Sequence, residues 1–213
     1  IGQGDEVITT AHTAVATASA IGLAGARPIF VDIEPGFFTI NPDLIEGAIT
    51  PKTKAIIPVH FAGQPCDMDE IYEISNRYKL RIIEDAAHAL PSHYKGNRIG
   101  NLKGTDVTCF SFYATKNLAI GEGGMILTKK ASNARKLKIL SLHGMNNDAW
   151  KRYSSTGYNH YKVVSPGFKY NMTDMQAIIG IEQLKKLPSF IKQRRKNAEI
   201  FVKLFIFLQK ESR

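Results

Sequence analysis

Two stretches of this sequence combine ionisable side chains with the small residues of tight turns. The first, Glu84-Asp85-Ala-Ala-His88, directly follows an apolar run. The second, residues 106–125, contains Ser111, Lys116 and the turn sequence Gly-Glu-Gly-Gly. A lysine between two buried strands is costly unless its amine is uncharged or bonded. One well-known use of such an amine is a covalent imine with an aldehyde.

The aldehyde that best explains the other residues is pyridoxal 5'-phosphate (PLP). This cofactor needs a lysine for its aldehyde, a carboxylate facing its pyridine nitrogen, a flat group over its ring and donors for its phosphate. The side chains that could meet these needs, in the same order, are Lys116, Asp85, His88 and Ser111.

Each of these residues also has an ordinary structural explanation. Asp85 could cap the turn that follows it, and His88 could be a half-buried histidine with satisfied hydrogen bonds. Ser111 could be a plain strand residue and the glycines a hairpin turn, and a lone lysine is normally solvated. Their joint occurrence in this order is much less probable by chance.

Strand and helix patterns alternate along the chain. The predicted strands are residues 6–8, 27–32, 54–60, 80–84, 107–112 and 125–127. The predicted helices are residues 13–24, one starting at Asn41, 67–78 capped by Asp67, 131–142, 171–187 and 189–208. Pro188 is expected to break the last pair, and residues 144–166 to form a long loop.

This alternation predicts an α/β fold with a mostly parallel central sheet flanked by helices. In such sheets, ligands gather at the carboxyl ends of the strands. Asp85 and His88 follow one such end and Lys116 follows another, so we expect chemistry at this edge.

Composition narrows the class of protein. Hydrophobic residues make up 44% of the chain, and no apolar run approaches the length of a membrane span. The two cysteines, Cys66 and Cys109, have no metal-ligand or disulfide spacing, which favours a reducing, cytoplasmic setting. The net charge of +9 is concentrated in residues 185–213, where a solvated helix face is favoured over a nucleic-acid site.

The sequence resembles the DegT/DnrJ/EryC1/StrS family of PLP-dependent nucleotide-sugar aminotransferases, which have PLP-transferase fold type I. The matching motifs are GDEVITTAHTAVATASAI, IIEDAAHA, GTDVTCFSFYATKNLAIGEGGMI and PGFKYNMTDMQAIIGIEQLKKL. They extend over nearly the whole chain, and the serine–lysine–glycine pattern with an upstream EDAAHA is specific to the family.

The resemblance implies a role for each candidate residue. Lys116 binds PLP as an imine, and Asp85 is the partner of the pyridine nitrogen. His88 lies against the ring, Ser111 donates to the phosphate, and Asn171 reaches the phosphate of a neighbouring subunit. A homodimer with the active site between subunits is therefore expected.

The chain departs from many members of the family at one position. Where they stack Trp or Phe on the ring of the cofactor, this chain has Ala14, so His88, His12 or a residue outside the sequence must cover the ring.

We expect the chain to be an internal fragment. Residues 1–187 are predicted to be the PLP-binding large domain without its N-terminal segment, and residues 188–213 the start of the connection to a C-terminal small domain. The predicted function is transfer of an amino group from glutamate to a nucleotide-linked keto-sugar, for cell-surface polysaccharide or aminosugar biosynthesis. The alternatives are a PLP-dependent sugar dehydratase and a catalytically silent dimerising fragment. Dehydratase relatives replace the lysine with histidine, whereas this chain keeps Lys116.

Overall fold

The computed structural model describes residues 1–146 and 161–211, excluding the side chains of 209–211. The predicted loop at 144–166 therefore lies largely outside the described residues. The chain forms two compact units. One comprises Ile1–Ser111 with Gly124–Met172, and the other comprises Phe112–Gly123 with Thr173–Arg213. The predicted domain boundary at residue 187 stays a prediction.

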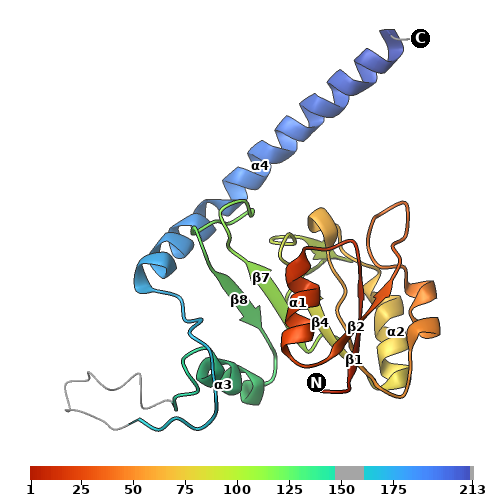
Figure 1. Cartoon of the computed structure of the whole chain (residues 1–213). Coiled ribbons are helices and arrows are strands. Elements are labelled where there is room, and N and C mark those ends of the chain that lie inside the picture. The colour runs from red at the N-terminus through yellow and green to blue at the C-terminus, as the bar shows by residue number, and fades with distance from the viewer. Residues whose placement is uncertain (147–160, 212–213) are drawn as a thin grey trace. The chain divides into compact units, whose positions relative to one another are not determined.

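The first unit is built on a six-stranded sheet with the strand order β2-β1-β3-β4-β7-β8 (Figure 1). All neighbouring pairs are parallel except β7 and β8, which are antiparallel. This confirms the predicted α/β fold with a mostly parallel sheet. The strands are β1 (Glu6–Thr10), β2 (Arg27–Val31), β3 (Thr53–Ile56), β4 (Arg81–Asp85), β7 (Val107–Ser111) and β8 (Gly124–Leu127). A separate hairpin pairs β5 (His93–Tyr94) with β6 (Asn97–Arg98).

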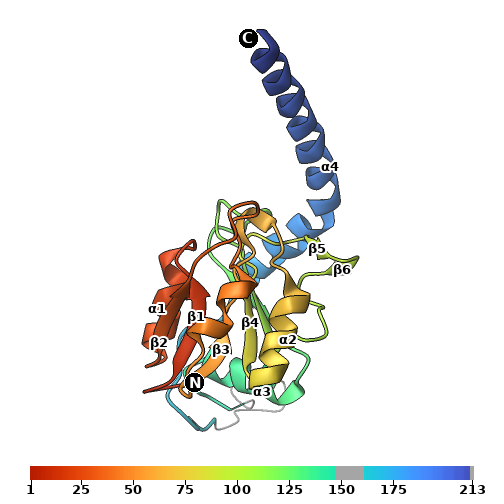
Figure 2. The ribbon, with the colours of Figure 1, turned by 90° about the vertical axis from the view of Figure 1, so that its right-hand side faces the viewer.

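Two helices cover opposite faces of this sheet. α1 (Val15–Leu23) lies on one face and α2 (Met68–Tyr78) on the other (Figure 2). α3 (Ala131–Leu140) follows β8. Short 3-10 turns at Pro42–Leu44, Glu46–Ala48 and Phe61–Gly63 fill the connections around β3.

The two faces are distinguished by the alternation of side chains along β4. Ile82 and Glu84 are fully buried, whereas Ile83 and Asp85 on the other face are only partly buried. Because successive residues of a strand point to opposite sides, the side chains of Glu84 and Asp85 lie on opposite faces of the sheet. Asp85 faces α1, and Glu84 faces α2.

Three details differ from the sequence-based predictions. β3 ends at Ile56 rather than at residue 60, because Pro58 has no N–H to extend the ladder. The helix expected from Asn41 is only a 3-10 turn, although Asn41 does accept a hydrogen bond from the Asp43 N–H. Asp67 precedes α2 without capping it through its side chain, because its carboxylate accepts the Tyr94 hydroxyl instead.

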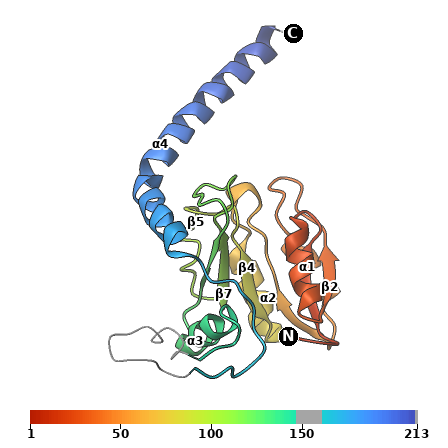
Figure 3. The same cartoon turned by 60° about the vertical axis from the view of Figure 1, so that its left-hand side comes forward.

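The predicted break at Pro188 is wrong. α4 is one continuous helix, Asp174–Glu211, with Pro188 inside it. Figure 3 shows that α4 changes direction along its length. A proline in a helix removes one hydrogen bond and clashes with the preceding turn, which can kink a helix rather than end it.

The second unit has its own small apolar contact surface. Leu118, Ile120 and Leu187 are buried, and a Cβ atom on Gly180 of α4 would lie 3.4 Å from the side chain of Ile120. A glycine here lets the helix approach the segment before β8 closely.

No helix in the described part of the chain is long and apolar enough to cross a membrane.

Candidate active site at the carboxyl edge of the sheet

Asp85 is the last residue of β4, and both oxygens of its carboxylate are oriented by donors. Oδ1 accepts the N–H of Ala87 at 3.1 Å, which is the local turn cap considered above. Oδ2 accepts the hydroxyl of Thr17, a buried residue of α1, at 2.7 Å. The turn cap therefore accounts for one oxygen, while the other is held by a helix 68 residues away in sequence.

The Thr17 hydroxyl belongs to a short relay. The hydroxyls of Thr13 and Thr17 lie 2.8 Å apart. Since the Thr17 proton is directed at Asp85, the Thr13 hydroxyl is the donor to Thr17. Neither threonine is among the residues predicted from the sequence. Their spacing of four residues, which would place them on one face of the predicted helix at residues 13–24, is the signal that could have identified them, although only Thr17 lies within α1.

The backbone of Asp85 is held from both sides. Its N–H donates to the carbonyl of Pro58 at 2.9 Å, and its carbonyl accepts the N–H of His60 at 3.0 Å. On the other side, the Ala86 N–H donates to the carbonyl of Cys109 at 2.9 Å. A residue tied to both neighbouring segments has little freedom, so the direction of its carboxylate is well defined.

Ser111 ends β7, the strand beside β4. Cys109 is the register partner of Asp85, so Ser111 lies two residues further along at the same edge of the sheet. His88 is an exposed residue of the turn after β4. The structure thus brings Asp85, His88 and Ser111 to the carboxyl edge of one sheet, a position that the alternating pattern predicts for Asp85 and His88.

The remaining candidates lie elsewhere along the chain. Lys116 follows Ser111 by five residues in the second unit, in a turn where its N–H donates to the carbonyl of Tyr113. Gly121 has φ +86°, and a Cβ atom on Gly124 would lie 2.8 Å from the carbonyl oxygen of Phe110, so glycine is required at both places. Asn171 precedes α4, and its side-chain oxygen accepts the amine of Lys169.

His12, the alternative ring cover, follows β1. Its imidazole packs against Phe61 with ring centroids 3.9 Å apart. Its Nδ1 lies 3.1 Å from the carbonyl oxygen of Phe38. These contacts hold the ring in place just beyond the carboxyl end of β1.

The negative charge at this edge affects nearby groups. Burial raises the pKa of the Cys109 thiol to about 11, and the charges of Asp85 and Glu84 add to the effect. Burial likewise raises the pKa of the Cys66 thiol to about 12. Both cysteines are free, and neither thiol ionises near neutral pH.

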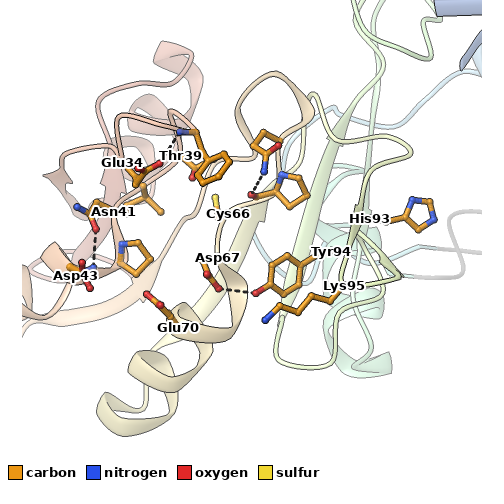
Figure 4. A pocket seen from close by; sticks show the side chains of 15 residues that line it. Glu34, Thr39, Asn41, Asp43, Cys66, Asp67, Glu70, His93, Tyr94 and Lys95 are labelled. Carbon is orange, nitrogen blue, oxygen red and sulfur yellow. Dashed lines mark hydrogen bonds between the residues drawn. The ribbon is translucent and has the colours of Figure 1, made fainter. Parts of the chain in front are cut away.

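A separate cleft of about 510 Å³ opens in the first unit between the turn after β2 and the start of α2 (Figure 4). Four carboxylates line it, from Glu34, Asp43, Asp67 and Glu70. It includes none of the predicted site residues. Within the described residues, no cluster of His, Cys, Asp and Glu is arranged to hold a metal ion.

The donor set at the edge of the sheet suits PLP. Each carboxylate oxygen has about two lone-pair directions, and each oxygen of Asp85 accepts one of the two bonds described above. Asp85 can therefore also accept the N–H of a protonated pyridine ring. A serine hydroxyl at the same edge is a suitable phosphate donor.

A mostly parallel sheet with an oriented aspartate and a serine at its carboxyl edge, followed in the sequence by a lysine, is the arrangement expected from the family resemblance. The chain belongs to the DegT/DnrJ/EryC1/StrS aminotransferase family, whose model matches residues 1–212. This confirms the resemblance found from the motifs.

Two curated proteins are similar to this chain over most of its length. The spore coat polysaccharide biosynthesis protein SpsC of Bacillus subtilis is 51% identical over 198 residues, which cover 93% of this chain and 50% of SpsC. The uncharacterized protein MJ1066 of Methanocaldococcus jannaschii is 55% identical over 197 residues, covering 92% of this chain and 50% of MJ1066.

Among solved structures, the putative sugar aminotransferase Spr1654 of Streptococcus pneumoniae is similar in both its PMP and PLP forms. For the PMP form the TM-score is 0.84 with 37% identity, covering 93% of this chain and 53% of Spr1654. The PLP form has the same TM-score and coverage at 36% identity. The chain thus spans about half the length of the relatives it matches.

Proposed function

We propose that the protein carrying this chain transfers an amino group from glutamate to a nucleotide-linked keto-sugar, for cell-surface polysaccharide or aminosugar biosynthesis. The observation that carries the proposal is the oriented carboxylate of Asp85 at the carboxyl edge of the sheet, in a chain of this family. Because the chain spans about half the length of its relatives, the proposal concerns the full-length protein. We also propose that this protein is a cytoplasmic homodimer.

PLP, when bound, supplies a protonated ring that withdraws electrons from the carbon losing its proton. In the proposal Asp85 accepts the ring N–H and stabilises its positive charge. Thr17 and the Ala87 N–H keep the two carboxylate oxygens in fixed directions. This orientation is present before any ligand arrives, so little reorganisation is needed on binding.

Lys116 is assigned two tasks. Its amine would hold the aldehyde of the cofactor, with loss of one water molecule. The free amine would also take the proton from the α-carbon of the amino donor as a general base and later return it as a general acid. Ser111 is assigned to the phosphate and His88 to the ring, while Asn171 is assigned to the phosphate of a neighbouring subunit.

The test begins with cofactor binding by the full-length protein. PLP should give a visible absorption band, and borohydride should abolish it and leave a reduced adduct on the peptide that contains Lys116. Lys116→Arg keeps a positive charge but should give neither band nor adduct. Lys129→Arg is the matched control, since the Lys129 amine binds the carbonyl of Leu102 at 2.9 Å and should be dispensable for the cofactor.

The substrate is identified by assaying nucleotide keto-sugars with glutamate. Transamination predicts an aminosugar and an equal amount of 2-oxoglutarate. Loss of water from the sugar without consumption of glutamate would instead identify a dehydratase. A full-length protein that shows no absorption band with PLP would contradict the proposal and favour a silent dimerising role.

A further inference from the structure

A buried polar cluster lies on the face of β4 opposite to Asp85. At its centre is Glu84, whose side chain is fully inaccessible to solvent. One carboxylate oxygen, Oε1, accepts the hydroxyl of Thr105 and lies 3.4 Å from that of Tyr72. The other, Oε2, lies 3.3 Å from Nε2 of the equally buried His60 and 3.4 Å from the Thr108 hydroxyl.

The surrounding donors assign the protons in this cluster. The backbone N–H of Cys66 points at Nδ1 of His60 at 3.2 Å, so Nδ1 is an acceptor and carries no proton. The proton of a neutral imidazole must then be on Nε2, which donates to Glu84. Since hydroxyl and imidazole donors surround both of its oxygens, Glu84 is assigned as an ionised carboxylate beside a neutral histidine.

An ionised carboxylate in the core is an expensive feature. Burial of a charge costs free energy unless hydrogen bonds replace its hydration, and an apolar side chain in its place is often as stable. Stability of the core alone therefore does not require a glutamate here. The next residue in the strand, however, is Asp85.

His60 links the cluster directly to Asp85. The side chain of His60 binds the carboxylate of Glu84, while its backbone N–H binds the carbonyl of Asp85 at 3.0 Å. The position of His60 in turn depends on the Cys66 N–H. One residue thus fixes two successive residues at the end of β4.

We propose that the buried Glu84–His60 pair is a positioning device for Asp85, which fixes the end of β4 and places a second negative charge behind the carboxylate that is to meet the cofactor ring. The inference rests on the proposed function of Asp85. It assigns to Glu84 and His60 a role that is not direct contact with the cofactor.

The electrostatic part of the proposal has support in neighbouring groups. The charge of Glu84 contributes to the raised pKa of the Tyr72 phenol on α2 and of the thiols of Cys66 and Cys109, in each case after burial. The two thiols also respond to Asp85. The two negative charges therefore act on the same surroundings, and together they should favour the protonated form of a ligand bound at Asp85.

The test uses Glu84→Gln in the full-length protein, with PLP as the probe. The amide keeps the size of the side chain but removes the charge and presents an NH2 group to donors. The dissociation constant for PLP should rise about tenfold. The midpoint of the pH dependence of the bound-cofactor absorption should move to lower pH by about one pH unit, because a negative charge that stabilised the protonated form is lost.

Glu6→Gln is the matched control. Glu6 is likewise a buried strand glutamate held by a threonine hydroxyl, but it starts β1 at the opposite edge of the sheet. It should lower the thermal unfolding midpoint and leave PLP affinity and the pH midpoint unchanged. If Glu84→Gln folds too poorly to measure, Thr108→Val removes one donor to Glu84 and should move both cofactor readouts in the same direction by less.

The outcomes separate this inference from the proposed function. A wild-type protein that gives no PLP band would overturn both. A wild-type protein that binds PLP, together with a Glu84→Gln variant that is merely less stable and has unchanged affinity and pH midpoint, would overturn this inference alone. The same holds for Thr108→Val if it is the variant measured.

Discussion

The hydroxyl of Thr17 donates a hydrogen bond of 2.7 Å to Oδ2 of Asp85, although 68 residues separate the two in the sequence. This bond joins α1 to the end of β4 and sets the direction of the Asp85 carboxylate. We assign this carboxylate to the ring nitrogen of the cofactor. Hydrogen bonds to ionised groups are roughly twice as strong as neutral ones. Thr17 is therefore expected to matter for the cofactor as well as for packing.

Thr17→Val tests this relationship with a side chain of nearly the same shape. Without its donor, Asp85 should hold the ring nitrogen less well, and PLP affinity should fall by about tenfold, from a bond worth about 1.5–3 kcal/mol. Titration of PLP into the full-length variant measures the effect. Thr128→Val is the control, because its hydroxyl binds the carbonyl of Asp106 instead, and it should leave PLP affinity unchanged.

Asp85→Asn removes the charge and keeps the shape. An amide cannot stabilise a positive ring nitrogen as a carboxylate does, so turnover should fall about ten- to a hundredfold while the fold is retained. Steady-state rates of the full-length protein measure this. Asp106→Asn removes a carboxylate that pairs with Arg81 and Lys130; it should affect stability and spare turnover. A near-normal rate for Asp85→Asn would show that Asp85 only caps the turn after β4 and has no role in turnover.

The general layout of this region was predictable because it depends on local patterns. Apolar and β-branched runs between helical segments identify parallel strands, and ligands gather at their carboxyl ends. This reasoning located Asp85 and His88, whereas Ser111 was identified from the needs of the cofactor and from the family resemblance. The neighbouring strands β4 and β7 then place Asp85 and Ser111 at one edge, since Cys109 is the register partner of Asp85.

The partners of these residues were not predictable in the same way. The Glu84–His60 pair spans 24 residues and the Thr17–Asp85 bond spans 68, so each depends on strand register and helix orientation. Asp67 preceded a helix and had the right side chain for a cap, yet the Tyr94 hydroxyl competes for its carboxylate. In each case a tertiary contact, rather than a local preference, determined the outcome.

Asp85→Asn also tests, without any cofactor, how the charge of Asp85 affects the pKa of a neighbouring thiol. The charge of Asp85 is the second-largest contributor to the raised pKa of Cys109, after burial, and the last of several for Cys66. Removing it should lower the pKa of the Cys109 thiol and speed its alkylation at pH 8 more than that of Cys66. Iodoacetamide labelling followed by peptide mass spectrometry measures both rates. Equal changes at the two cysteines would contradict the predicted effect of the Asp85 charge on Cys109.

The last prediction concerns acid stability and the carboxylate of Glu6 at the start of β1. Its pKa is lowered from 4.5 by a hydrogen bond from the Thr50 hydroxyl and then by one from Arg27. A folded-state pKa below that of the unfolded chain means that the unfolded chain binds the proton more tightly. The stabilisation is therefore complete above pH 4.5 and is lost as pH falls through the folded-state value.

Glu6→Gln should accordingly unfold at a lower urea concentration than wild type at pH 7, and the difference should shrink as the pH is lowered towards 3. Urea unfolding of both proteins across this pH range measures it. The control is Glu182→Gln, which removes an exposed carboxylate whose pKa is also lowered, in this case by Lys185. Solvent screens that pair, so this variant should differ little from wild type at any pH. If the difference in urea unfolding between Glu6→Gln and wild type stayed constant down to pH 3, the substitution would destabilise the protein through altered packing rather than through loss of the charge.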